Sequence, residues 1–132
     1  MDGPRERKVD STKLRRFILD ILQLCDMSIE EREILADTLV AADLRGMRSH
    51  GCLRLPIYVE KIRAGGFRAG RKGRVERETD SIVLLDGEDG VGQVLAVRAM
   101  DEAMRKARGR GIGAAGVTRS NHYGEAAYYV VH

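Results

Sequence analysis

The sequence predicts an α/β fold in which an N-terminal three-helix segment precedes the beginning of a mixed α/β domain. Three observations predict this order. Apolar residues repeat at helical spacing through the first half of the chain, a β-branched apolar run follows near residue 82, and a further helical stretch then leads into a second short strand. The expected boundaries are a polar disordered tail over 1–10, a helical segment over 11–66, a basic connection over 67–80 and part of an α/β domain over 81–132.

Two predicted helices occupy the first third of the chain. Ser11 or Thr12 can cap the first helix, and Ser28 with Glu31 forms a capping box that satisfies backbone N–H groups at the start of the second. Gly46 suits the C-cap of the second helix. Their apolar residues repeat three and four positions apart: Leu14, Phe17, Ile18, Ile21 and Leu22 in the first helix, and Ile34, Leu35, Leu39 and Ala42 in the second.

A third helix is expected between Leu53 and Ile62, with Tyr58 on its apolar face. Pro56 belongs in its first turn, because a proline in a helix interior would cost about 3 kcal/mol. Gly65 follows the last apolar residue and closes the helix. The helical half of the chain therefore ends just before the basic connection.

Basic residues alternate with glycines between this helix and the first strand. We interpret the segment as a solvated connection, because a run of charge is usually an exposed surface. The alternative is a loop that contacts phosphate, either of nucleic acid or of a phosphorylated cofactor. Phe67 offers the only aromatic surface there on which a base could stack, which argues against nucleic acid. The basic residues are Arg63, Arg68, Arg71, Lys72, Arg74 and Arg77.

The second half of the chain predicts a strand over 81–85, a helix over 94–108 with Lys106 on its outer face, a strand over 113–118 and a last helix over 124–132. Gly111, Gly113 and Gly116 have the spacing G-x-G-x-x-G of dinucleotide-binding motifs. Here the motif follows a helix and leads into a strand, which is the reverse of the order that such a site needs. We therefore expect Gly111 to end the helix and the other two glycines to allow close packing.

Composition and charge exclude several classes of protein. Hydrophobic residues make up 43% and charged residues 33%, with a net charge of +3, which is typical of a globular domain. No apolar run reaches the roughly 18–20 residues of a membrane span, and the N-terminus lacks the apolar core of a signal peptide. Cys25 and Cys52 are isolated, so neither a disulfide framework nor a metal site is expected. The sequence therefore predicts a cytoplasmic protein without a membrane partner.

Two histidines stand at predicted element boundaries. His50 follows Ser49 at the end of the second helix, and His122 follows Ser120 and Asn121 at the end of the second strand. Imidazole titrates near neutral pH, which makes it the usual proton carrier in catalysis, although a single histidine is more often structural.

Arginines surround the first of these motifs. Arg54 lies four residues after His50 and could bind a carboxylate through two parallel hydrogen bonds, and Arg48 is a second candidate. A histidine that moves a proton beside an arginine that holds a carboxylate suits the interconversion of a 2-hydroxy acid and a 2-keto acid.

These motifs belong to a series of blocks: 39–46 (LVAADLRG), Ser49-His50-Gly51, Arg54-Leu55-Pro56 with Tyr58, Asp86-Gly87 with Gly90, Gly92 and Gln93, and Ser120-Asn121-His122-Tyr123-Gly124. Together, and in this order, they resemble the malate/L-lactate dehydrogenase family of NAD(P)-dependent 2-hydroxyacid oxidoreductases. The resemblance runs from about residue 12 to the end of the chain. It implies a nucleotide-binding α/β domain that is not a Rossmann fold, and a homodimer whose active site lies near the interface.

The resemblance also implies functional residues. Ser49 and His50 would act as proton relay and donor, or His122 would be the acid/base; the resemblance does not choose between them. Arg54 or Arg48 would hold the carboxylate of a 2-hydroxy or 2-keto acid. Ser120 and Asn121 would lie at the NAD or NADP cofactor.

Members of this family are considerably longer, and their main nucleotide-contacting segments follow the region where this chain ends. The apolar residues 126–132 also stop without a polar tail. Both observations predict a truncated chain that lacks most of its cofactor site. The alternative function is a non-catalytic binding or dimerisation module. A nucleic-acid-binding protein that uses the basic segment is the weakest interpretation.

Overall fold

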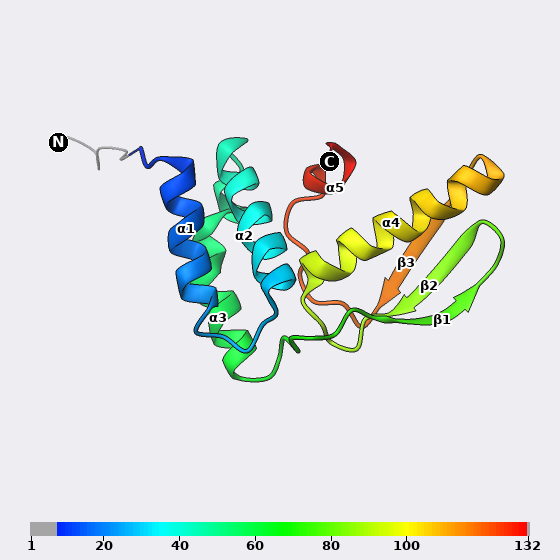
Figure 1. The fold of residues 1–132 in the computed structure, drawn as a ribbon, viewed down its shortest axis with the longest axis horizontal. Helices are drawn as coiled ribbons and strands as arrows, with labels where there is room; N and C mark the ends of the chain where they lie inside the picture. Colours follow the sequence, from blue (N-terminus) through cyan, green and yellow to red (C-terminus); the bar gives the residue numbers. More distant parts are fainter. Residues whose placement is uncertain (1–7, 132) are drawn as a thin grey trace.

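A computed structural model describes residues 8–131, and the greater part of the expected tail, residues 1–7, lies outside the described residues, as does His132. Figure 1 shows a group of helices at one end and a sheet with its covering helix at the other. This arrangement confirms the expected α/β class. The elements are α1 (Ser11–Leu22), α2 (Ile29–Leu44), α3 (Leu55–Arg63), β1 (Arg74–Glu78), β2 (Ile82–Asp86), α4 (Gly92–Arg110), β3 (Ala114–Thr118) and α5 (Ala127–Val131).

The helical end is built from α1, α2 and α3. Asp10, and not Ser11 or Thr12, caps α1, because its carboxylate accepts a hydrogen bond from the backbone N–H of Lys13 at 3.0 Å. The capping box of Ser28 and Glu31 opens α2 as expected. The core between the helices consists mainly of Ile18, Leu22, Leu35, Leu39, Leu55 and Tyr58.

Helix α3 begins later than expected. Two short 3₁₀ turns, Arg48–His50 and Cys52–Arg54, precede it, so Leu53 lies outside the helix and is 72% exposed. Pro56 is in the first turn, where its missing N–H costs no helical hydrogen bond. His50 therefore lies on a short turn between α2 and α3, outside both regular helices.

The sheet has three strands in the order β1-β2-β3. β1 and β2 are antiparallel, and β2 and β3 are parallel with α4 as the crossover between them. β1 occupies part of segment 67–80, which was expected to be a connection; all its residues are exposed. The carboxyl end of β3 leads directly to the loop that carries His122.

Helix α4 packs closely against β3. A Cβ on Gly113 would lie 2.0 Å from the carbonyl oxygen of Ala103, so glycine is required there, and Gly111 ends α4 in the left-handed conformation. The glycine motif thus serves packing, as its order predicted. The expectation for Lys106 was wrong: this residue is buried, and its ammonium donates to the carbonyl of Thr79 and lies 3.2 Å from a carboxylate oxygen of Glu78.

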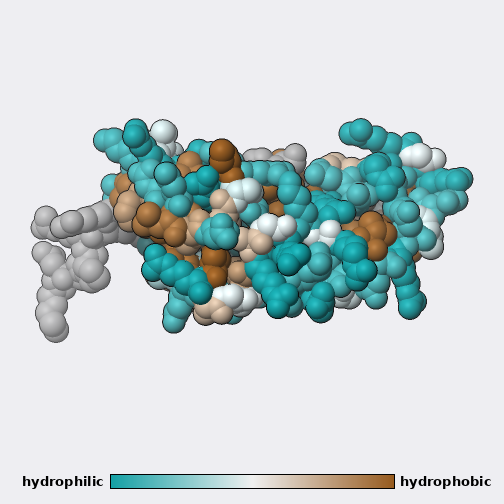
Figure 2. All heavy atoms as spheres, turned by 60° about the horizontal axis from the view of Figure 1, so that its bottom comes forward, coloured by the Kyte–Doolittle hydropathy of each residue, from teal (hydrophilic) through white to brown (hydrophobic). Residues whose placement is uncertain are grey.

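The two ends of the molecule share one core. Phe67, Val91 and Val94 pack in the same cluster as the residues of the helices. Figure 2 shows the face at the bottom of Figure 1. On this face, hydrophilic side chains cover most of the sheet end and apolar patches lie over the helical end. Within residues 8–131, no helix is long and apolar enough to cross a membrane.

Acidic side chains hold the basic connection in place. The buried carboxylate of Glu31 accepts from the backbone N–H of Gly70 at 2.7 Å, and Lys72 pairs with Glu30. Arg71 lies 4.0 Å from Glu88 at the turn after β2. These pairs satisfy charges of residues 68–72 within the fold, so the part of the segment before β1 is an ordered loop.

Candidate functional site

The fold brings the two histidines together from its two ends. His50 lies on the first 3₁₀ turn and His122 in the loop after β3, with their ring centroids 5.5 Å apart. Ser49 Oγ is 2.9 Å from His50 Nδ1. Arg54 donates from Nε to the carbonyl oxygen of Ser49 at 2.7 Å, which places its guanidinium beside the pair.

The turn that carries His50 is fixed by Asp43 of α2. The Asp43 carboxylate accepts a hydrogen bond from the backbone N–H of Cys52 at 2.8 Å. A Cβ on Gly51 would lie 1.9 Å from Asp43 Oδ1, so only glycine leaves room for the carboxylate at this point. The last turns of α2 therefore determine where His50 lies.

The loop that carries His122 is fixed by close packing of its backbone on α4 and by the side chain of Asn121. A Cβ on Gly92 would lie 2.3 Å from the carbonyl oxygen of Asn121 and 2.4 Å from that of His122, so the loop rests directly on the first turn of α4. The side-chain nitrogen Nδ2 of Asn121 donates to the backbone carbonyls of Gly66, Asp89 and Gly90 at 3.1, 2.8 and 3.1 Å. Asn121, which the resemblance placed at a cofactor, supports this loop.

The His122 side chain is exposed, and its ring contacts Tyr58. The Tyr58 hydroxyl lies 2.7 Å from His122 Nδ1, and the backbone N–H of Gly124 donates to the same nitrogen at 3.3 Å. Partial desolvation of the ring lowers the pKa of His122, and the nearby positive groups Arg54, His50 and Lys61 lower it further. The neutral imidazole is therefore favoured at this position.

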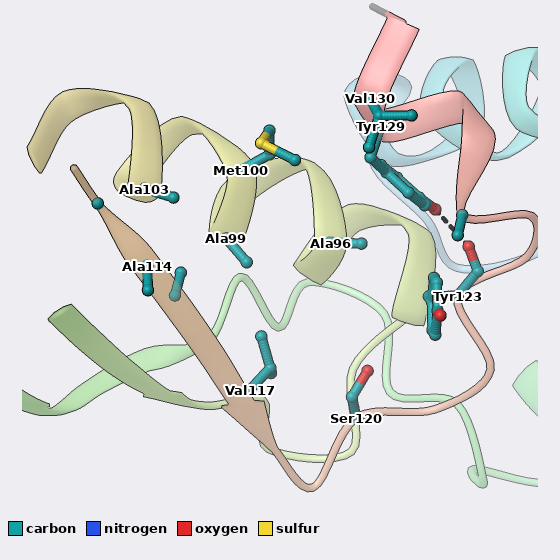
Figure 3. A pocket seen from close by; sticks show the side chains of 13 residues that line it. Ala96, Ala99, Met100, Ala103, Ala114, Val117, Ser120, Tyr123, Tyr129 and Val130 are labelled. Atoms are coloured by element: carbon teal, nitrogen blue, oxygen red, sulfur yellow. Dashed lines mark hydrogen bonds between the residues drawn. The ribbon is translucent and has the colours of Figure 1, made fainter. Parts of the chain in front are cut away.

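Ser120 lines an apolar groove of about 600 Å³ that also includes Tyr123, whose ring lies beside His122. Figure 3 shows the groove between Ala96, Ala99 and Ala103 of α4 and Ala114 and Val117 of β3, with Tyr123 and Tyr129 at one end. The Ser120 hydroxyl donates to the carbonyl of Asn121 at 2.9 Å. Because small residues line both walls, the groove can admit a flat apolar ring.

Arg48 lies on the same 3₁₀ turn as His50. It lines a hollow of about 840 Å³ together with Asp43, Leu44, Cys52 and Leu53, and neither His50 nor His122 lines this hollow. Besides desolvation, the charge of Arg54 lowers the pKa of His122, which makes Arg54 the first candidate for the carboxylate and Arg48 the second. Among the described residues, no cluster of histidine, cysteine and carboxylate side chains could hold a metal ion.

Sequence reasoning assigned no role to two residues of this site. Tyr58 fits the apolar face of α3, and its ring is indeed buried, but its hydroxyl contacts His122. Gln93 is completely buried in the first turn of α4, and neither atom of its side-chain amide forms a hydrogen bond within the described part of the chain. The signals for Gln93 were its polarity in an otherwise apolar turn and its place in the blocks that carry the resemblance.

An ion pair at the end of β2 stabilises the start of the His122 loop. Arg119, which has a left-handed backbone (φ 46°), donates from Nε and Nη2 to the Asp86 carboxylate at 2.8 Å each. The Arg119 guanidinium is the main cause that holds the pKa of Asp86 at about 2, below its ordinary value of 3.8.

We expect Asp86→Asn to remove a pH dependence of stability. Because the pKa of Asp86 is lower in the folded protein, the pair stabilises fully above pH 3.8 and loses this effect as the pH falls through about 2. The measurement is the melting temperature of both proteins across this window. Equal slopes for wild type and variant would contradict the assignment.

Comparison with known proteins gives one consistent result. The family described as malate/L-lactate dehydrogenase matches residues 9–132. The malate dehydrogenase of Pyrococcus horikoshii is 44% identical over 124 residues, which are 94% of this chain and 34% of that protein. The malate/(S)-sulfolactate dehydrogenase of Methanothermus fervidus is 43% identical over 87% of this chain and 34% of its own length. The NAD⁺-dependent ureidoglycolate dehydrogenase of Escherichia coli is 31% identical over 93% of this chain and 35% of its own length.

The solved structures agree with the sequences. The structure of the P. horikoshii malate dehydrogenase superposes with a TM-score of 0.93 at 42% identity, covering 98% of this chain and 38% of that one. The sulfolactate dehydrogenase of Methanocaldococcus jannaschii superposes with a TM-score of 0.88 at 32% identity, over 92% of this chain and 35% of that one. The chain spans about a third of the length of the curated relatives that it matches.

Proposed function

Because this chain belongs to the malate/L-lactate dehydrogenase family, we propose that the protein transfers hydride between a nicotinamide cofactor, NAD or NADP, and C2 of a small 2-hydroxy or 2-keto acid. The observation that carries the proposal is the pair His50 and His122, 5.5 Å apart, with Arg54 beside it. One histidine can transfer a proton to the C2 oxygen of the substrate, and the other can form a hydrogen bond to the same oxygen. Arg54 can pair with the substrate carboxylate.

We propose separate tasks for the histidines and the arginine. Reduction of the keto acid adds a hydride to C2 and a proton to the carbonyl oxygen, so one imidazole gives up a proton in each turnover. Arg54 would hold the carboxylate and thereby fix the position of C2. Its Nε is engaged by Ser49, so a carboxylate would meet the two terminal nitrogens.

We propose that the nicotinamide ring binds in the apolar groove beside β3, whose end at Tyr123 lies next to His122. Alanines and a glycine line most of it, and the hydroxyl of Ser120 lies among them. When bound, the nicotinamide supplies or accepts the hydride. Ser120 would contact the cofactor directly, while Asn121 would hold the loop from which Ser120 projects.

The test is cofactor oxidation by the complete gene product. We expect NADH or NADPH to be oxidised in the presence of 2-keto acids, and to be formed from malate, sulfolactate or another 2-hydroxy acid. A panel of such acids with each cofactor identifies the substrate and the preferred nicotinamide. If no acid supports turnover with either cofactor, the proposed function is wrong.

We also propose that the protein is a cytoplasmic homodimer. The resemblance implies the dimer, and α1 and the turn before α3 leave apolar side chains exposed, with Phe17 at 56% and Leu53 at 72%. These residues line a hollow of about 900 Å³ that a second subunit could cover. Sedimentation of the wild type and of Leu53→Glu tests the dimer, because a monomeric wild type would contradict it.

The cytoplasmic location is supported by the cysteines. Both are free thiols, which suits a reducing compartment.

Arg54→Lys is expected to raise KM for the keto acid about tenfold, because lysine lacks the planar fork that binds both carboxylate oxygens. Arg48→Lys, made in parallel, decides between the two arginines. An effect at Arg48 with none at Arg54 would reverse the assignment. Steady-state kinetics at several acid concentrations provides the measurement.

A further inference from the structure

Tyr58 reaches the candidate site from inside the core. Its ring is only 2% exposed, and its hydroxyl lies 2.7 Å from His122 Nδ1. A side chain fixed in this way cannot follow movements of a solvent-exposed imidazole. The histidine is therefore held by the tyrosine.

The second contact to His122 Nδ1 decides which ring nitrogen carries the proton. The backbone N–H of Gly124 points at Nδ1 at 3.3 Å, and a backbone N–H can only donate. Nδ1 must therefore present its lone pair, and the Tyr58 hydroxyl, which can donate or accept, donates to it as well. In a neutral imidazole, the remaining proton then lies on Nε2.

Gln93 lies behind this contact. Its amide is fully buried without a hydrogen-bond partner among the described residues, and Nε2 lies 3.5 Å from where a Cβ on Gly124 would be. The amide also lies beside the Tyr58 hydroxyl, whose pKa burial raises and Gln93 and Arg54 lower. The unpaired amide of Gln93 is the group available to donate to the phenol oxygen, and such a donor would turn the hydroxyl proton toward His122.

His50 has a different environment. Its Nδ1 faces the hydroxyl of Ser49 at 2.9 Å, and a serine hydroxyl can rotate to donate or to accept. His50 can therefore gain and lose a proton on Nδ1 without losing this hydrogen bond. His122 cannot, because protonation of Nδ1 would set it against the N–H of Gly124.

We propose that Tyr58, backed by Gln93, is a positioning residue that holds His122 as the neutral Nε2–H tautomer, so that His122 donates a hydrogen bond to the substrate oxygen while His50 transfers the proton. This inference rests on the proposed function and divides its acid–base work. In reduction, C2 gains the hydride, the carbonyl oxygen gains the proton of the His50 imidazolium, and His50 is left neutral. His122 polarises the same oxygen and keeps its proton throughout.

The surrounding charges agree with this division. The groups that face His122 are Arg54 and His50 from the turns before α3, Lys61 from α3, and the rings of Tyr58 and Tyr123. The charged groups among these are cations, and they disfavour an imidazolium at His122. A lowered pKa suits a hydrogen-bond donor that stays neutral.

The test is nitrogen NMR of the histidine side chains in protein labelled with ¹⁵N-histidine, without substrate or cofactor. We expect His122 to show a protonated Nε2 and an unprotonated Nδ1 near neutral pH. Tyr58→Phe removes only the hydroxyl and should produce a mixture of tautomers. Tyr123→Phe is the matched control, because its ring lies beside the same imidazole at 6.5 Å and its hydroxyl is not the group on Nδ1.

Each outcome is decisive. A proton on Nδ1 of His122 in the wild type would overturn the proposal, and so would a tautomer that Tyr58→Phe leaves unchanged. The measurement needs no turnover, so it can succeed even where the dehydrogenase assay fails. Circular dichroism of Tyr58→Phe confirms that the fold is intact, and Gln93→Leu gives a second variant with the same expected shift toward a mixture.

Discussion

Replacing Gly92 with alanine is expected to displace the loop that carries His122 and to remove nearly all activity. The added Cβ would lie 2.3 Å from the carbonyl oxygen of Asn121 and 2.4 and 2.5 Å from the carbonyl oxygen and carbon of His122. These are backbone atoms, so no side-chain rotation can relieve the overlap. Either the loop moves away from α4 or the helix shifts, and overpacking of this kind typically costs about 1–3 kcal/mol.

Gly109→Ala is the matched control, because it makes the same change in the same helix. A Cβ at Gly109 would meet no atom within 4 Å. We expect this variant to be more stable than the wild type by about 0.5–1 kcal/mol, since alanine favours the helix over glycine. Urea unfolding and turnover of both variants test the comparison. If Gly92→Ala kept the wild-type activity, the loop would not depend on this close approach.

The elements that the sequence predicted well are those set by local patterns. The capping box at Ser28 and Glu31 and the proline at the start of α3 each act within a few residues, so they can be identified without a partner. Strand β1 was missed because its charged residues are exposed along their whole length and resemble a loop. Its pairing with β2 is a tertiary property that local composition does not show.

The site was only partly predictable for the same reason. Each histidine could be recognised by its neighbours in sequence, but their contact joins the turn after α2 to the loop after β3. Tyr58 has the spacing of a core residue, and the acceptor of its hydroxyl lies 64 positions away. Gly92 and Gln93 differ from ordinary helix residues only through what packs on them. Physical reasoning on one sequence does not supply such distant partners.

Substitutions at the two histidines are expected to lower kcat in different ways. His50→Ala removes the proton carrier, and general acid–base catalysis is typically worth about 10²–10⁴ in rate. Its residual activity should also lose the dependence on pH that the imidazole of His50 causes. His122→Ala removes a hydrogen bond to the same oxygen, so kcat should fall while the pH dependence from His50 remains.

Glutamine at each position separates the two roles more sharply. A glutamine amide can donate a hydrogen bond, but it cannot accept and release a proton near neutral pH. His122→Gln should therefore recover part of the activity that His122→Ala loses, whereas His50→Gln should be no better than His50→Ala. The measurement is kcat as a function of pH for all four variants of the complete gene product. Glutamine can replace only a histidine that keeps its proton. If His50→Gln recovered activity and His122→Gln did not, His50 would be the hydrogen-bond donor and His122 the proton carrier.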